Sequence, residues 1–480
     1  MERINLKQLV NTLEVAVNGF IPDNMFIERI VTDTREDVSD GLFVALKGEN
    51  FNGHDFVNEA IDKGAKAILI SEDINFSNSP ALSGPLQKTI ILKAEDMLKV
   101  LMQIASFYRN FWGGLLVGVT GSVGKTSTKE LIATVLEQKY NVFRTQKNLN
   151  SEVGVFKNIL SLKREHKVAV IEMAMCALGE IEALSIGVKP DIAVITKIGV
   201  AHLEFLKTRE NILKAKMEIT AGLKKGGLLI LNGDDEYLSK VCPSANYEVL
   251  FCGMTQNNFD IHAKNISQEG IVGTSFEINF ADISSPSIKA YIPLAGKHHV
   301  SNALIACAVA KKLGVSDEQI KKGLANYDPT GARQNVIIKN DITYVLDYYN
   351  ANPDSVAAAL DVLSNLEQTA KKVFVFGDMG ELRDATKQEH MNIGKLAAQK
   401  AITIFCLGQA SRFAYEEAKR LGMAEALWFG DKKELAKTLQ TVLMRGSTVW
   451  IKGSRFMKME EVAELLGLLA EQEKVGGEKA

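Results

Sequence analysis

The fold of this chain is indicated by one stretch, Leu115-Leu116-Val117-Gly118-Val119-Thr120-Gly121-Ser122-Val123-Gly124-Lys125-Thr126-Ser127-Thr128-Lys129-Glu130-Leu131. An apolar run of valine and leucine breaks at glycines, and a helical pattern begins directly after them. This order predicts a strand, a phosphate-binding loop and a helix. Gly121 and Gly124 permit a tight turn whose N–H groups point at a polyphosphate, and a helix starting near Lys125 adds the positive end of its dipole. The stretch therefore predicts a nucleotide-phosphate site.

The side chains of this loop have separate expected roles. Lys125 reaches the β- and γ-phosphates, and the hydroxyl of Thr126 is placed to bind Mg²⁺. The usual pattern has glycine at position 119, where this chain has Val119, and its glycine comes one residue earlier. A plain glycine turn is the alternative, but Gly-Lys-Thr after a buried strand favours the phosphate loop. The further ATP contacts are expected at Gly121, Ser122, Val123, Gly124 and Ser127.

The composition is that of a soluble enzyme with several domains. A length of 480 residues predicts about three domains, and 46% hydrophobic with 24% charged residues is typical of globular chains. A net charge of -2 gives no basic field, which argues against nucleic acid as a partner. The five cysteines are scattered without a CxxC pair, so we expect free thiols rather than disulfides or metal ligands. No signal peptide or transmembrane segment is expected, which favours a cytoplasmic protein.

Polar residues follow the later strand-like runs. One buried run ends in Glu172, the next leads to His202, and a third is followed by Asp234. In an open α/β sheet, ligands lie beyond the carboxyl ends of the strands, beside the phosphate loop. Hard oxygen ligands with one imidazole suit Mg²⁺ or Mn²⁺ better than zinc. We therefore expect Glu172 and His202 to converge with Thr126 on Mg²⁺.

The pattern divides the chain into three α/β domains. Residues 1–93 read as a mixed α/β domain, and residues 94–328 hold the phosphate loop and a mostly parallel sheet. Residues 329–480 alternate strand and helix as in a Rossmann-like domain, but without GxGxxG, so dinucleotide binding is unsupported. A helix over 94–108 opens the second domain. The glycine- and charge-rich segment 471–480 is expected to be disordered.

Several polar residues fit two interpretations when they are taken alone. Arg35 and His54 suit either a diphosphate or a surface salt bridge, and the residues by themselves favour the salt bridge. Asn302 lies on the first turn of a predicted helix, where asparagine is usually a cap. Lys216 reads as an exposed lysine of a predicted helix.

Taken together, these residues resemble the Mur ligases, a family of ATP-dependent enzymes that form amide bonds in peptidoglycan synthesis. The resemblance extends from Thr32 to Glu460. Motifs of family-wide character are the Gly-x-Thr-Gly-Ser-x-Gly-Lys-Thr loop, Asn148-x-Asn150 with Gly154, Glu172 with Gly179-Glu180-Ile181, His202-Leu203-Glu204, Ala215-Lys216-x-Glu218-Ile219, Asn232-x-Asp234 and Gly296-x-His298 with Asn302. Motifs similar to one branch, which adds D-alanyl-D-alanine, are Asp33-Thr34-Arg35, Gly53-His54-Asp55, Asp347-x-Tyr349-Asn350-Ala351-Asn352-Pro353, Gly377-Asp378-Met379-x-Glu381-Leu382 and Lys452-Gly453-Ser454-Arg455.

The resemblance implies a reaction and a set of roles. ATP would phosphorylate the terminal carboxylate of UDP-N-acetylmuramoyl-tripeptide, and the amine of D-alanyl-D-alanine would displace phosphate to give the UDP-linked pentapeptide. Two Mg²⁺ ions are implied, with Thr126, Glu172, His202 and a carbamylated Lys216 (N6-carboxylysine) as ligands. Lys125, His202 and Lys216 would be catalytic. Further ATP contacts are implied at Asn302, Arg333 and Asp347; UDP-substrate contacts at Thr34, Arg35, Lys47, His54, Asn148 and Asn150; and D-alanyl-D-alanine or domain-closure roles at Asn350, Asn352, Asp378, Glu381, Lys452 and Arg455. We expect a monomer.

Four positions depart from the pattern of the family. Ala174 and Lys207 replace glycine, His299 replaces asparagine, and Asn52 replaces aspartate. These changes leave open the local loop geometry and the nucleotide contacts, but they remove no charged residue from the core set. Two alternatives are another amide ligase of the superfamily, such as a folylpolyglutamate synthetase, and a P-loop regulatory ATPase. The sequence also leaves open whether the third residue of the tripeptide is lysine or diaminopimelate.

Overall fold

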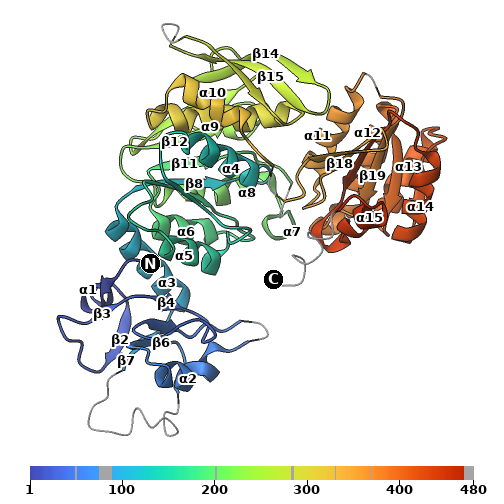
Figure 1. Cartoon of the computed structure of the whole chain (residues 1–480). Helices are drawn as coiled ribbons and strands as arrows, with labels where there is room; N and C mark the ends of the chain where they lie inside the picture. The colour runs from blue at the N-terminus through green and yellow to red at the C-terminus, as the bar shows by residue number, and fades with distance from the viewer. Residues whose placement is uncertain are drawn as a thin grey trace.

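The computed structural model describes residues 1–48, 51–74, 89–200, 203–282, 286–329, 331–367 and 369–469. Its three large sheets follow one another along the chain (Figure 1). The N-terminal part, drawn in blue, lies at one end of the central part, and the C-terminal part, drawn in orange to red, lies beside the central part. The predicted α/β class with three successive sheet-containing parts is confirmed.

The N-terminal part is a mixed sheet with short helices. Its five strands run in the order β2-β7-β6-β5-β4, with β2 antiparallel to β7 and the others parallel. The strands β1 and β3 form a separate antiparallel pair. The bounds are β1 (Ile4–Asn5), α1 (Leu6–Val10), β2 (Val15–Asn18), β3 (Phe26–Ile27), β4 (Ile30–Val31), β5 (Leu42–Val44), η1 (Gly53–Phe56), α2 (Val57–Asp62), β6 (Ala67–Ile70) and β7 (Ile90–Ala94).

Helix α3 (Met97–Trp112) connects the N-terminal and central parts. The predicted helix began three residues too early, because Ala94 still belongs to β7 and Asp96 caps the helix by accepting the N–H of Lys99. One continuous apolar core reaches from the N-terminal sheet across α3 to the central sheet. The two parts therefore share their packing at this helix.

The central part is built on a nine-stranded sheet in the order β16-β15-β14-β13-β12-β11-β8-β10-β9. It is parallel from β9 to β14, and β15 and β16 are antiparallel, which confirms the mostly parallel sheet. The strands are β8 (Leu115–Thr120), β9 (Val142–Arg144), β10 (Val168–Glu172), β11 (Ile192–Ile195), β12 (Gly227–Asn232), β13 (Tyr247–Gly253), β14 (Ile261–Glu269), β15 (Gly273–Phe280) and β16 (Ile288–Ile292).

Helices cover both faces of this sheet and bury two apolar cores. The helices α3, α5, α6 and α8 contribute to one core, and α4, α9 and α10 contribute to the other. Since both faces are covered, the inner strands are almost entirely apolar, as expected for parallel strands. The helices are α4 (Lys125–Leu136), α5 (Glu152–Leu160), α6 (Glu180–Val188), α7 (Leu203–Leu206), α8 (Arg209–Met217), η3 (Glu218–Thr220), η4 (Leu238–Lys240), α9 (Lys297–Lys312) and α10 (Asp317–Ala325).

The C-terminal part is the predicted Rossmann-like layer structure. Its strand order is β17-β18-β22-β19-β20-β21, and all pairs are parallel except β17 with β18. The bounds are β17 (Asn335–Lys339), β18 (Ile342–Leu346), α11 (Pro353–Ser364), β19 (Lys372–Gly377), η5 (Arg383–Ala385), α12 (Thr386–Gln399), β20 (Thr403–Leu407), α13 (Ser411–Arg420), β21 (Leu427–Phe429), α14 (Lys432–Val442), β22 (Thr448–Lys452), η6 (Arg455–Met457) and α15 (Glu460–Leu465).

Polar contacts join the central and C-terminal parts beside the phosphate loop. Lys197 Nζ pairs with Asp354 Oδ1 at 2.7 Å, and Arg383 pairs with Glu204. In the described part of the chain, no helix has the length and apolar character needed to cross a membrane. The segment 471–480, which the sequence predicts to be disordered, lies outside the described residues.

Candidate active site

The phosphate loop connects β8 to the first turn of α4. Gly121 has a φ of 151°, and a Cβ there would lie 2.0 Å from the hydroxyl of Thr196, so a side chain would collide. Gly124 has a φ of 85° and faces the amide of Asn302, whose Oδ1 would be 3.2 Å from an added Cβ. The two glycines are therefore required by close approach and by backbone conformation. The same geometry brings Asn302, a predicted ATP contact, against the loop.

Lys125 folds back over this loop. Its Nζ donates a hydrogen bond to the carbonyl of Gly121 at 2.8 Å. Burial lowers the pKa of Lys125, and the negative charge of Glu172 partly opposes that effect. A lysine held against the loop at the first turn of α4 is suited to bind a polyphosphate, as the sequence predicts.

Arg333 reaches the loop from the start of the C-terminal part. Its Nη2 donates to the hydroxyl of Thr126 at 3.1 Å, and its guanidinium stacks on Tyr349 at 4.0 Å from the ring centroid. Two residues separated by more than two hundred positions thus meet at the predicted phosphate site. Sequence position alone gives no indication of this contact.

Glu172 ends β10 as predicted and is almost fully buried. Its Oε1 accepts a hydrogen bond from Asn150 Nδ2 at 2.8 Å, while its Oε2 is buried without a hydrogen-bond partner. The Lys129 ammonium lies 4.0 Å from this oxygen, beyond hydrogen-bond distance, so a cation at the site would add the close contact that a buried carboxylate requires. The donor set therefore fits a divalent ion held between Glu172 and Thr126.

Lys216 lies on α8 and is wholly buried, so it is not an exposed helix lysine. Its Nζ has no hydrogen-bond partner. Burial, and then the nearby charge of Lys125, lowers the pKa of Lys216 well below its ordinary value. The lowered pKa favours the neutral, nucleophilic form of the amine, and conversion to a carbamate would supply the missing contacts.

One predicted metal ligand, His202, lies outside the described residues. Among the residues that are described, no group of three or more His, Cys, Asp and Glu side chains is placed to hold a metal ion. Complete coordination would therefore need additional ligands, for which the carbamate of Lys216, His202 and substrate oxygens are the candidates.

Three of the predicted UDP-site residues, His54, Lys47 and Arg35, make local contacts within the first domain. His54 uses both ring nitrogens: Nε2 accepts the N–H of Ser71 at 3.0 Å, and Nδ1 donates to Asn52 Oδ1 at 2.8 Å. Burial lowers the pKa of His54, which favours the neutral ring. Lys47 pairs with Glu72 at 2.7 Å, exposed Arg35 pairs with Asp33 at 2.6 Å, Thr34 is buried and Asn148 is exposed.

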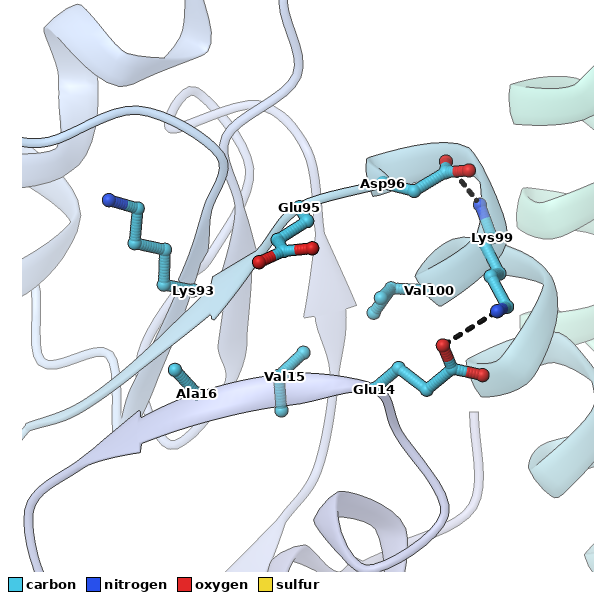
Figure 2. Close-up of a pocket in the computed structure, with 8 residues that line it drawn as sticks. All are labelled: Glu14, Val15, Ala16, Lys93, Glu95, Asp96, Lys99 and Val100. Carbon is cyan, nitrogen blue, oxygen red and sulfur yellow. Dashed lines mark hydrogen bonds and ion pairs between the residues drawn. The ribbon is translucent and has the colours of Figure 1, made fainter.

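A cavity of about 570 Å³ in the same region lies between β2, β7 and the start of α3 (Figure 2). Within its lining, Lys99 pairs with Glu14 at 2.6 Å, and Asp96 caps the helix by accepting the N–H of Lys99 (Figure 2). None of the predicted site residues lines this cavity.

Among the predicted third-domain residues, Lys452, Asp347 and Asn350 are joined by hydrogen bonds at the carboxyl ends of the strands. Lys452 Nζ donates to Asp347 Oδ2 at 2.8 Å and to the carbonyl of Asn350 at 3.1 Å. Asn352 caps α11 together with Ser355. Three further predicted residues, Asp378, Arg455 and Glu381, belong to the same part of the chain. Asp378 accepts the N–H groups of Ala410 and Ser411, and Arg455 donates to Glu460 at 3.0 Å. Glu381 has a φ of 63°. Their roles toward substrates stay predictions.

Two of the departures from the family pattern have visible consequences. Lys207 has a φ of 67°, the left-handed conformation that glycine adopts most easily. Asn52 caps η1 by accepting the N–H of His54 through its Oδ1, a contact that an aspartate of the same length could also make. Of the other two, His299 is buried against His298 with ring centroids 3.9 Å apart, and Ala174 donates its N–H to the carbonyl of Asn150 at 2.9 Å.

Known families match the chain in three successive regions. Residues 27–109 match the "Mur ligase family, catalytic domain", residues 119–310 the "Mur ligase middle domain" and residues 332–455 the "Mur ligase, glutamate ligase domain". Together with the P-loop site and the three-part α/β fold, these matches define the class: the chain belongs to the Mur ligase family.

Its relatives specify the branch. The UDP-N-acetylmuramoyl-tripeptide–D-alanyl-D-alanine ligase of Bacillus subtilis is 34% identical over 96% of this chain and 98% of the relative, and that of Escherichia coli is 32% identical over 97% and 99%. Among solved structures, MurF from Acinetobacter baumannii is similar with a TM-score of 0.86 and 32% identity over 97% of this chain and 99% of that one. MurF from Thermotoga maritima in complex with ADP has a TM-score of 0.79 and 30% identity over 91% and 96%. The chain is thus a MurF-like Mur ligase.

Proposed function

We propose that this protein joins D-alanyl-D-alanine to UDP-N-acetylmuramoyl-tripeptide, with ATP converted to ADP and phosphate. The observation that carries the proposal is the meeting of the phosphate loop with Glu172, Lys216 and Arg333, in a chain similar along its length to ligases of that name. The peptidoglycan precursor and the dipeptide are therefore the proposed partners, and nucleic acid is not. We further propose that the protein acts as a cytoplasmic monomer.

The proposed reaction has two steps. A carboxylate oxygen of the tripeptide attacks the γ-phosphorus, the bond to the bridging oxygen breaks, and ADP leaves with the electron pair. The dipeptide amine then attacks the acyl carbon and loses a proton, and phosphate leaves. Two anions must approach each other in the first step, so Lys125 and Arg333 would offset their repulsion at the phosphates.

Magnesium and a carbamate complete the proposal. Thr126 and Glu172 would hold one Mg²⁺, and His202 with carbamylated Lys216 would hold the second. Bound Mg²⁺ would supply charge neutralisation of the phosphates. Support comes from the unpartnered Oε2 of Glu172 and the buried, unpartnered Nζ of Lys216.

The nucleotide would lie between two parts of the protein. Asn302 faces the loop from the central part, and Asp347 is proposed to contact the ribose from the third. The proposed limits of the three domains remain 1–93, 94–328 and 329–480. Closure of the third domain over the nucleotide would exclude water from the acyl phosphate.

The defining experiment measures phosphate release from ATP with UDP-N-acetylmuramoyl-tripeptide, with and without D-alanyl-D-alanine. We expect release that requires both substrates and a pentapeptide product by mass. A requirement for a different amine would assign another branch of the family, and release without either substrate would indicate a regulatory ATPase. Lys125→Ala should abolish turnover, and an unchanged rate would contradict the phosphate-loop assignment.

The carbamate gives a separate prediction. Lys216→Ala should lower kcat by about 100-fold or more, because the second cation loses an oxygen ligand. Short carboxylic acids such as acetate or formate should restore part of the activity by filling the vacated space. Lys214→Ala, on the same helix, is the control and should show neither effect. Activity unaffected by the Lys216 substitution would remove the carbamate from the proposal.

A further inference from the structure

A second lysine of the P-loop helix lies buried behind the metal site. Lys129 is one helical turn beyond Lys125 and has only 1% of its surface exposed. Its Nζ pairs with Glu130 Oε1 at 2.8 Å and donates to the carbonyl of Thr145 at 2.8 Å. A buried ammonium is costly unless paired and hydrogen-bonded, so this position is highly constrained. None of the roles proposed above uses it.

The contacts of Lys129 lead to the carboxylate proposed to bind Mg²⁺. Thr145 accepts from Lys129 through its carbonyl and from the N–H of Glu172 through its hydroxyl, at 2.8 Å in both cases. Lys129 Nζ also lies 4.0 Å from Glu172 Oε2, the oxygen without a hydrogen-bond partner. The lysine thus acts on Glu172 both through Thr145 and directly through charge.

On the side away from Glu172, the contacts of Lys129 continue to strand β9. Glu130 also pairs with Arg144 Nη1 at 2.8 Å, at the end of strand β9. Three elements, α4, β9 and β10, are therefore joined by charged and polar contacts behind the site. On its inner side, Glu172 Oε1 meets Asn150, which lies five residues beyond Thr145 on the same connection.

We propose that Lys129 is a positioning residue for the metal site: it holds Thr145 and the carboxylate of Glu172 in the geometry that binds the divalent cation of the nucleotide complex. The proposal rests on the proposed function, because it assumes that Glu172 binds the cation. Lys129 is buried behind the site, with only 1% of its surface exposed. Its charge balances Glu172 before the cation arrives, and its hydrogen bond to Thr145 fixes the backbone that precedes Asn150.

The test compares two buried cations. Lys129→Met keeps the length of the side chain and removes its charge and hydrogen bonds. Arg109→Met is the matched control, since Arg109 is equally buried and paired with Asp191 at 2.8 Å, but lies on α3 away from the loop. Binding of Mn²⁺ is measured directly by electron paramagnetic resonance with a non-hydrolysable ATP analogue and without peptide substrates. This readout does not depend on ligase activity.

We expect Lys129→Met to weaken Mn²⁺ binding about tenfold and to raise the Mg²⁺ concentration for half-maximal activity by a similar factor. The control should lower stability and leave both quantities within about twofold. Unchanged Mn²⁺ binding in Lys129→Met, with only a loss of stability, would overturn the proposal, and so would tighter binding, because the lysine would then merely repel the cation.

A second variant covers the case in which Lys129→Met does not fold. Thr145→Val is nearly isosteric and removes only the hydroxyl that accepts from the Glu172 N–H. It should weaken Mn²⁺ binding in the same direction, and binding within twofold of the wild type would contradict the proposal. Normal ligase kinetics and unshifted Mn²⁺ binding in the variants would reject only the role of Lys129. Phosphate release by the wild-type protein without either peptide substrate would instead reject the proposed function.

Discussion

At the scale of single residues, the strongest features are side chains whose surroundings contradict their type. Lys216 is a fully buried lysine whose Nζ makes no hydrogen bond, and Glu172 has one buried oxygen that makes no hydrogen bond. Both lie where an added group or a cation would satisfy them. Buried polar atoms without hydrogen bonds are rare in folded proteins, because each one lowers stability, so such atoms indicate a functional site.

Lys207 provides a prediction at this scale. It is exposed and has a φ of 67°, which costs a residue with a Cβ about 1 kcal/mol. Lys207→Gly should therefore raise the free energy of unfolding by about 0.5 kcal/mol, the strain relieved exceeding the added flexibility of the unfolded chain. Urea denaturation measures the change. Lys207→Ala is the control and should bring no gain, and a less stable glycine variant would show that the strain is absent.

At the scale of elements, the strand ends and helix starts organise the site. The sequence predicts the strands that end at Glu172 and near Asp347, because buried parallel strands are apolar and contrast with the polar residues that follow them. It does not reveal β2, β17 or β21, which are short or partly exposed edge strands with weak patterns. Helix ends were also imprecise where a cap such as Asp96 decides them.

Asp378 carries the prediction at this scale. It follows β19, and its two oxygens accept the N–H groups of Ser411 at 2.7 Å and Ala410 at 3.1 Å, at the start of α13. Asp378→Asn should lower the free energy of unfolding by about 1 kcal/mol, because a charged acceptor leaves the positive end of the helix.

Asp431 is the matched comparison for this prediction. It caps α14 through the N–H groups of Lys433 and Glu434 in an exposed setting. Asp431→Asn should cost less than Asp378→Asn in thermal unfolding, because water replaces its contacts more easily. Equal costs would show that the burial of Asp378 adds nothing to its capping.

At the scale of the whole molecule, the central and C-terminal parts meet around His298. Its pKa is lowered to about 4 by burial first and then by Lys452 and Lys197, one from each part, while Asp361 opposes the shift. The ring therefore stays neutral in the folded protein at neutral pH. Protonation would place an unpaired positive charge between the two parts.

This shift has a definite sign. The unfolded chain binds the proton near pH 6.5 and the folded protein only near pH 4, so the stabilising contribution is complete above pH 6.5 and is lost as the pH falls toward 4. When the pH falls from 7 to 5, the free energy of unfolding should decrease in both proteins. We expect the decrease to be about 1–2 kcal/mol smaller in His298→Gln than in the wild type, as measured by denaturant unfolding. Parallel pH profiles of the two proteins would contradict the assignment.

The sequence by itself determined the phosphate loop, the polar residues that follow the buried strands, the family resemblance and the three-part α/β organisation. These features depend on local patterns: glycine spacing, apolar runs and their polar ends. Only the tertiary structure decided that Arg333 meets Thr126, that Lys216 is buried and unpaired, and that Lys129 lies behind Glu172. The physical reason is that burial and charge pairing depend on contacts between residues far apart in the chain, which no local pattern records.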